Sequence, residues 1–173
     1  MIQAVYGSTV QCYTTTEEYR INTAVTTAKI RYLCKLTNEM SKAVKYVYGL
    51  TQAVYDRYTY FTWNHTTTAD SAANTLAGNV NLVPNGYWKY EIYEVSWVGS
   101  PTLTTDTAPI KETQTLPVAD ANGIVQGRVE LGKLYVAEKV GEEQVQYTQR
   151  TRSEESNYIY YGNKKLNYAY RKQ

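Results

Sequence analysis

The chain has 173 residues, of which 43% are apolar and 20% are charged, and its formal net charge is +2. Its apolar residues form no run near the roughly 18 needed to span a bilayer, which counts against a helical membrane protein. The weak charge counts against the concentrated positive field of a dedicated nucleic-acid binder. The opening MIQAVYGSTV lacks the basic start and apolar stretch of a secretory signal, so we expect no export.

Tyrosine dominates the aromatic residues, with 19 tyrosines against one phenylalanine and three tryptophans. A tyrosine ring packs well on a half-buried strand surface, and its hydroxyl group finds a partner at a wet protein interface. The composition therefore favours a β-rich protein that makes contacts with other molecules.

Residues 1–25 are polar and rich in threonine, with a short strand candidate at residues 10–13. We expect either an N-terminal arm or an edge strand here. From Ala28 onward, apolar and charged residues alternate with one apolar exception, Leu33, and turn-forming residues follow at 38–41. This period of two predicts a β-hairpin over residues 28–48.

Two more strands are predicted in aromatic segments. Residues 56–63, DRYTYFTW, are aromatic and β-branched, whereas the fifteen residues after them lack a period and predict a surface loop. Residues 87–98 give the strongest strand pattern of the chain. Alternation predicts that one face of this strand carries Trp88, Tyr90 and Ile92, and the other Tyr87, Lys89, Glu91 and Tyr93.

The second half of the chain begins with a long excursion over residues 99–123, which holds three of the four prolines and ends in a turn. Residues 127–137 predict a strand with Gly132 as a candidate bulge, and residues 145–148 predict one more. From Arg150 onward the chain is basic and rich in tyrosine.

These patterns predict an all-β fold, a single antiparallel β-sandwich of the immunoglobulin-like or jelly-roll-like kind. The expected organisation is an N-terminal arm or edge strand at 1–25, the sandwich at 26–149 and a basic, tyrosine-rich tail at 150–173. The candidate core residues are Ile30, Tyr32, Leu36, Trp88, Tyr90, Ile92, Leu134 and Val136.

The sequence shows no motif that indicates catalysis, a metal or a cofactor, and we expect a non-enzyme without cofactors. The only histidine, His65, lies in a polar stretch without a nearby partner, and no G-x-S-x-G, G-x-G-x-x-G or P-loop motif occurs. Adjacent glutamate pairs point to opposite sides of an extended chain. We expect Cys12 and Cys34 to be buried free thiols rather than a disulfide, and the sequon at Asn64 to belong to a loop.

Two surfaces are candidates for binding. Glu91 and Glu94 flank Tyr93 and could serve carbohydrate binding, but a solvent-facing strand edge is the favoured interpretation. In the tail, arginine and tyrosine could stack on nucleic-acid bases, although the alternation of aromatic residues favours an extended segment on a protein partner. The candidate partner-interface residues are Arg150, Arg152, Tyr158, Tyr160, Tyr161, Lys164, Lys165, Tyr168, Tyr170 and Arg171.

Four phrases in order resemble small virion-associated proteins of tailed bacteriophages, including crAss-like phages: YLCKLTNEMSKAVKYVYGL, YDRYTYFTW, LVPNGYWKYEIYEV and VELGKLYVAE. The shared elements here are Arg57 to Phe61, Gly86 to Glu94 and Glu130 to Val136, within residues 28–147. The resemblance implies a β-sandwich on a capsid, neck or tail that binds other virion proteins, with no enzymatic residues to carry over.

The resulting hypothesis is a phage structural protein, an auxiliary or decoration protein of the head that binds the major capsid protein and copies of itself. It would be made in the bacterial host cytoplasm and end in the virion, without membrane or nucleic-acid partners. A neck, tail-ring or fibre-attachment component is the alternative, with portal or tail proteins as partners. A carbohydrate-binding module that stacks Trp88, Trp97 or exposed tyrosines on sugars is the alternative from another class.

Overall fold

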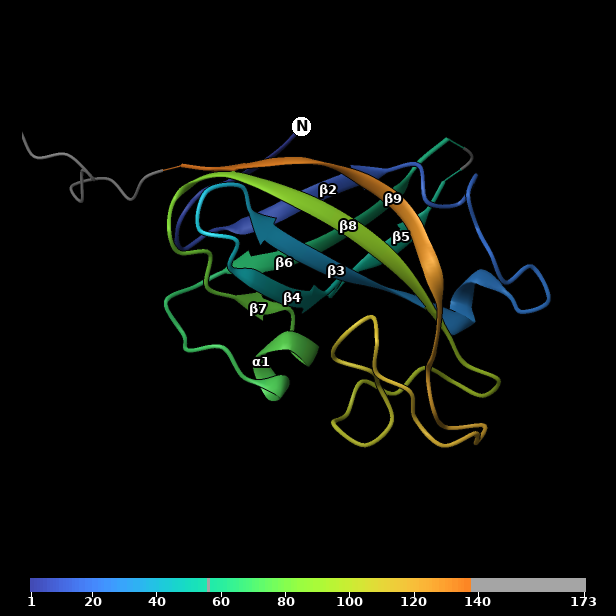
Figure 1. Ribbon diagram of the computed structural model, residues 1–173. Coiled ribbons are helices and arrows are strands. Elements are labelled where there is room, and N and C mark those ends of the chain that lie inside the picture. The colour runs from blue at the N-terminus through green and yellow to red at the C-terminus, as the bar shows by residue number, and fades with distance from the viewer. Residues whose placement is uncertain (56, 138–173) are drawn as a thin grey trace, which may run out of the picture. The chain divides into compact units, whose positions relative to one another are not determined.

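The computed structural model describes residues 1–55 and 57–137 and is mostly β (Figure 1). The tail at 150–173, and the strand predicted at 145–148, lie outside the described residues. The elements in chain order are β1 (Ile2–Ala4), β2 (Thr9–Thr14), η1 (Thr27–Lys29), β3 (Ile30–Asn38), β4 (Val44–Tyr48), β5 (Gln52–Val54), β6 (Thr59–His65), α1 (Ala72–Leu76), β7 (Asn79–Val80), β8 (Gly86–Ser96) and β9 (Ile124–Val136).

The strands form two mixed sheets. The five-stranded sheet has the order β1-β9-β8-β3-β4, and the four-stranded sheet has the order β2-β6-β5 with β7 also paired to β6. The predicted hairpin at 28–48 is present as β3 and β4, which pair antiparallel. The expectation of antiparallel pairing throughout is wrong for β1 with β9 and for β6 with β7, which are parallel. Parallel neighbours are not joined by a hairpin turn, so no local turn signal in the sequence announces them.

The two sheets share one hydrophobic core. Val10, Cys12, Phe61 and Trp63 from the four-stranded sheet pack in the same buried cluster as residues from β3, β8 and β9. All eight candidate core residues named from the sequence are in this cluster: Ile30, Tyr32, Leu36, Trp88, Tyr90, Ile92, Leu134 and Val136. The period-two pattern brings them together because alternate side chains of a strand lie on one face.

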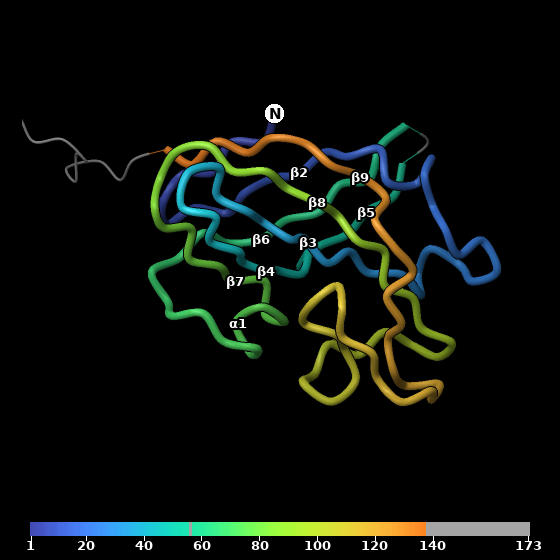
Figure 2. The backbone as a smooth tube through the Cα atoms, in the orientation of Figure 1, coloured from blue at the N-terminus to red at the C-terminus, as the bar shows by residue number. Residues whose placement is uncertain are grey.

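The long strands β8 and β9 curve, so the five-stranded sheet curls like half of a barrel (Figure 2). The register between them shifts after Ile92 and again after Glu94, and such bulges increase strand twist. The predicted bulge at Gly132 is wrong, because Gly132 lies in regular register opposite Tyr90. A Cβ atom there would come within 2.5 Å of the Tyr90 hydroxyl oxygen, so the glycine leaves room for the tyrosine ring.

A second hydrophobic cluster covers the opposite face of the five-stranded sheet at one end. Leu33, Tyr48 and Trp97 pack there with Ala108, and Leu103 and Ile110 add to the cluster from the 99–123 segment. Figure 1 shows this segment beside the ends of β8 and β9. Leu33, the exception to alternation in its strand, is fully buried because this end of the sheet is covered on both faces.

Two segments that the sequence describes only loosely contain regular structure. The predicted loop after residue 63 includes the short helix α1, capped by Ser71, whose hydroxyl oxygen accepts a hydrogen bond from the Asn74 amide at 3.1 Å. The helix contacts β4 and β7. Residues 1–25 supply β1 and β2, which lie at the edge of the five-stranded and four-stranded sheets respectively.

Candidate functional site

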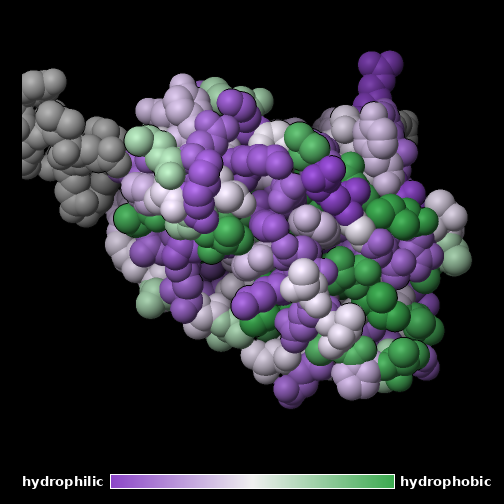
Figure 3. Space-filling view, in the orientation of Figure 1, coloured by the Kyte–Doolittle hydropathy of each residue, from purple (hydrophilic) through white to green (hydrophobic). Residues whose placement is uncertain are grey.

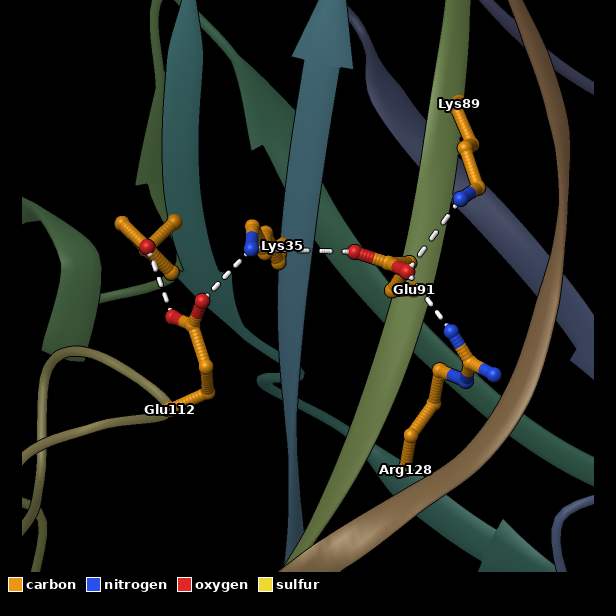
Figure 4. Close-up of polar contacts among 6 residues, drawn as sticks. Lys35, Lys89, Glu91, Glu112 and Arg128 are labelled. Carbon is orange, nitrogen blue, oxygen red and sulfur yellow. Dashed lines mark hydrogen bonds and ion pairs between the residues drawn. The ribbon is translucent and has the colours of Figure 1, made fainter.

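A polar network lies on the face of the five-stranded sheet opposite the main core (Figure 4). Glu91 of β8 is its centre. The Arg128 guanidinium donates to the Glu91 carboxylate at 2.9 Å, and the Lys89 ammonium donates to it at 3.3 Å. The Lys35 Nζ atom lies 3.8 Å from the other Glu91 oxygen. Three cations from three adjacent strands therefore surround one carboxylate.

Glu112 extends this network into the 99–123 segment. Its carboxylate accepts a hydrogen bond from Lys35 at 2.5 Å and another from the Tyr46 hydroxyl at 2.7 Å. Both donors lie on the hairpin β3–β4. The contact therefore ties the long segment to the sheet beside the second hydrophobic cluster.

Three cationic side chains face two carboxylates in this network, and their excess positive charge keeps both carboxylates ionised. Burial alone raises the pKa of Glu91, but hydrogen bonds from Arg128 and Lys89 and the nearby lysine charges outweigh burial and hold the pKa below its ordinary value. Burial also raises the pKa of Glu112, and hydrogen bonds from Lys35 and Tyr46 reverse that effect. A general acid needs a raised pKa, so this geometry suits a structural clamp better than proton transfer.

The expectation that Glu91 and Glu94 face solvent is wrong. Glu91 is 9% exposed and Glu94 is fully buried. The two Glu94 carboxylate oxygens accept hydrogen bonds from the backbone amides of Ile21 and Asn22, both at 2.8 Å. Glu94 therefore anchors the loop between β2 and η1, a role that depends on residues more than seventy positions away.

The tryptophans proposed for sugar stacking are buried in the protein interior. Trp88 is fully buried in the main core, and Trp97 is 1% exposed in the second cluster. Gly123 lies against the Trp97 ring, where a Cβ atom would come within 2.5 Å of the ring carbon Cζ2. The part of the carbohydrate hypothesis that relies on Trp88 and Trp97 is therefore wrong.

His65 is a buried residue at the end of β6. Its Nδ1 atom lies 3.4 Å from the Val80 carbonyl oxygen, and its ring packs edge-on against Tyr6. Burial lowers its pKa, although the contact with Val80 opposes this. The neighbouring sequon residue Asn64 lies in the strand rather than in a loop, and its side chain bonds Thr9 and Asn79.

Cys12 and Cys34 are free, buried thiols, as expected from the sequence. They line a cavity of about 10 Å³ in the main core. The Trp63 indole N–H donates to the Cys12 sulfur at 3.1 Å. Burial raises the pKa of Cys12 to about 12 and that of Cys34 well above its ordinary value, so neither thiol is a ready nucleophile.

Four tyrosines gather on the four-stranded sheet and the β5–β6 connection, and we call them the tyrosine cluster: Tyr13 of β2, Tyr60 of β6, and Tyr55 and Tyr58 of the connection. Tyr13 is 59% exposed, Tyr55 51% and Tyr58 38%. Ring centroids are 5.7 Å apart between Tyr13 and Tyr58, 5.1 Å between Tyr13 and Tyr60, and 4.7 Å between Tyr55 and Tyr58. The sequence did not identify this group, because the register of β2 against β6 creates it.

The face of the molecule seen in Figure 3 carries both hydrophilic and hydrophobic residues. Figure 3 shows mainly hydrophilic residues over the strands, with hydrophobic residues gathered at the lower right. The 99–123 segment and its borders carry exposed Val98, Val118 and Ile124. These apolar side chains are separate from the tyrosine cluster, which lies on the other sheet.

The ten tail residues predicted to form a partner interface, Arg150 to Arg171, lie outside the described residues. Among residues 1–55 and 57–137, no three or more histidine, cysteine, aspartate or glutamate side chains gather as a metal site requires. No helix in the described part of the chain is long and apolar enough to cross a membrane. Comparisons of the chain with protein-family models, with curated proteins and with solved structures found no match.

Proposed function

We propose that this chain is a non-enzymatic structural protein of a bacteriophage virion, an auxiliary or decoration protein of the head. Its proposed partners are the major capsid protein and neighbouring copies of itself. The observation that supports a contact-making role is the tyrosine cluster, in which Tyr13, Tyr55 and Tyr58 are exposed and neighbouring rings lie side by side. The virion itself is proposed from the resemblance of the sequence phrases.

The chemistry of the cluster suits a protein partner. Tyrosine supplies a large contact area with few rotatable bonds, and its hydroxyl group tolerates water at the interface. Such residues are enriched among those that dominate binding energy in protein interfaces. A flat sugar-binding platform is less well supported, because the ring planes of Tyr13 are inclined by 60° to Tyr58 and by 46° to Tyr60.

The finer description of the fold is also a proposal. Two sheets around a common core are compatible with a β-sandwich of the immunoglobulin-like or jelly-roll-like kind. The parallel pairs β1–β9 and β6–β7 depart from both, since those folds are built from antiparallel strands. A neck, tail-ring or fibre-attachment component uses the same contacts and is the alternative location.

The test combines the virion and the cluster. Mass spectrometry of purified particles of the phage that encodes the chain should detect the protein. In a phage carrying Tyr13→Ser with Tyr58→Ser, incorporation should fall at least about tenfold, which corresponds to about 1.4 kcal/mol of lost binding. The matched control is Tyr87→Ser with Tyr135→Ser, an aromatic pair on the five-stranded sheet with centroids 5.1 Å apart.

The two parts of this proposal fail separately. Absence of the unaltered protein from purified particles contradicts the virion location. Full incorporation of the Tyr13 and Tyr58 double variant contradicts the role of the tyrosine cluster, even if the protein is present in the particle.

A further inference from the structure

A groove runs along the outer edge of β2. It has a volume of about 500 Å³ and lies between β2, at the edge of one sheet, and β1, at the edge of the other. Its lining is Met1, Ile2, Gln3, Val5, Ser8, Thr9, Gln11, Tyr13 and Tyr90. None of these side chains carries a formal charge.

The backbone along this groove has unused hydrogen-bonding groups. On β6, the His65 amide donates to the Ser8 carbonyl oxygen, on the side of β6 where β2 lies. The Thr62 and Asn64 amides donate to the carbonyl oxygens of Thr51 and Gly78, on the other side of β6. Because ladder bonds alternate along an antiparallel strand, Val10, Cys12 and Thr14 face β6 with their backbone groups. The N–H and C=O groups of Thr9, Gln11 and Tyr13 therefore point into the groove, and β2 pairs with no described strand on that side.

The facing strand β1 presents the same chemistry. The Ala4 carbonyl oxygen accepts a hydrogen bond from the amide of Ala137, the residue that follows β9. The backbone groups of Ala4 therefore face β9. In a parallel pair the bonds also alternate, and the backbone groups of Gln3 point away from β9. Each rim thus offers backbone donors and acceptors, and the longer row, on β2, is one that an extended polypeptide satisfies and a small molecule does not.

The edge of β2 also lacks the usual protection against strand pairing. Natural edge strands are typically short, or carry a charged residue, a proline or a covering element. β2 is six residues long, TVQCYT, with neither a charge nor a proline. By contrast, β1 and β5 have three residues each, and β4 contacts α1 and β7. β2 is therefore the edge in the described part of the chain that is best suited to pair with a further strand.

We propose that this groove binds, by strand addition, residues 158–161 from the tail of a second copy of the chain. The proposal rests on the assembly role above and names the site on the body that receives the tail. Residues 158–161, YIYY, form an uncharged run with strong strand propensity, which matches the uncharged side chains that line the groove. The intervening residues 138–157 can reach about 65 Å at roughly 3.3 Å per residue, enough to extend to a neighbouring molecule.

A proline at Gln11 tests the backbone requirement in the full-length protein. Gln11→Pro removes an N–H group that points into the groove and that makes no bond to β6, so the fold should survive, as prolines are tolerated on edge strands. Gln11→Thr removes the same side chain but keeps the N–H group, and is the matched control. In sedimentation experiments we expect the unaltered protein and Gln11→Thr to self-associate, and Gln11→Pro to be monomeric with a retained thermal transition.

Complementary variants identify the source of the strand. Tyr160→Pro disables the donor segment but keeps the groove, whereas Gln11→Pro disables the groove but keeps the donor. Each variant alone should be monomeric, and an equimolar mixture should form a 1:1 complex. Amide exchange at Thr9, Gln11 and Tyr13 should slow by at least about tenfold on association of the unaltered protein.

Several results overturn this proposal. One is self-association of Gln11→Pro at the same concentration as the unaltered protein, and another is the absence of a complex in the mixture of Gln11→Pro with Tyr160→Pro. A third is protection from amide exchange that does not depend on protein concentration, because this would indicate binding of the chain's own tail. If Gln11→Pro instead loses its thermal transition, the exchange measurement on the unaltered protein decides. Amide exchange at Thr9 and Tyr13 that stays equally fast when the unaltered protein associates overturns the proposal. None of these results removes the protein from virions, so failure of the groove is distinguishable from failure of the proposed function.

Discussion

Replacing Glu94 with alanine should destabilise the protein by about 2–4 kcal/mol. Its buried carboxylate accepts two backbone hydrogen bonds, from Ile21 and Asn22, both at 2.8 Å. Hydrogen bonds to a charged group contribute about 1.5–3 kcal/mol each, and an amide left without a partner in the interior adds a desolvation cost. The full sum of two such bonds is an upper limit, because the loop at 15–26 can move and expose its amides to water.

Glu94→Gln separates the hydrogen bonds from the shape of the side chain. The amide group keeps one carbonyl acceptor but turns a donor toward the second backbone N–H, so the expected loss is about 1–2 kcal/mol. Urea unfolding followed by tryptophan fluorescence measures both changes, and hydrogen exchange at Ile21 and Asn22 reports the loop. Glu39→Ala, which removes a more exposed partner of Lys133, is the control and should stay within about 0.5 kcal/mol. A loss below that limit for Glu94→Ala would refute the anchoring role.

Three further predictions concern the rest of the described domain. Leu33→Ala should cost about 2–5 kcal/mol in urea unfolding, because the 99–123 segment buries this residue, and a surface-like loss below 1 kcal/mol would contradict the second cluster. The pKa values of Glu91 and Glu112 are lowered in the folded state. Their contribution to the free energy of unfolding should therefore be fully present above their unfolded pKa values near 4.5, and it should be lost as the pH falls through their folded pKa values. Glu91→Gln with Glu112→Gln should flatten this acid dependence, measured as the free energy of unfolding against pH. Cys12 and Cys34 should react with iodoacetamide only after unfolding, and rapid labelling of the folded protein by mass spectrometry would contradict their burial.

Periodicity in the sequence was sufficient to locate the hairpin of β3 and β4 and the long strands β8 and β9, but not the short strands β1, β5 and β7. Trp88, Tyr90 and Ile92 share the core face predicted for them, and the hairpin at 28–48 is present. These features depend on alternation and turn residues within a few positions, which a sequence displays directly. The helix α1 is five residues long, too short to give the repeat by which a helix is recognised.

Pairing between distant segments was decided only in the tertiary structure. The parallel contacts of β1 with β9 bring residues more than 130 positions apart into register, and no local pattern specifies such a pairing. The same holds for the tyrosine cluster, where Tyr13 meets Tyr58 and Tyr60 through the register of β2 against β6.

The environment of individual side chains could not be predicted from the sequence either. Glu91 and Glu94 look like a solvent-facing edge in a strand pattern, yet the first is enclosed by three cations and the second by two backbone amides from the N-terminal loop. Leu33 breaks the alternation because a proline-rich segment seventy residues later covers it. The sequence by itself determined which residues alternate along each strand, whereas tertiary packing determined which of those faces meet solvent, because exposure depends on what distant segments cover.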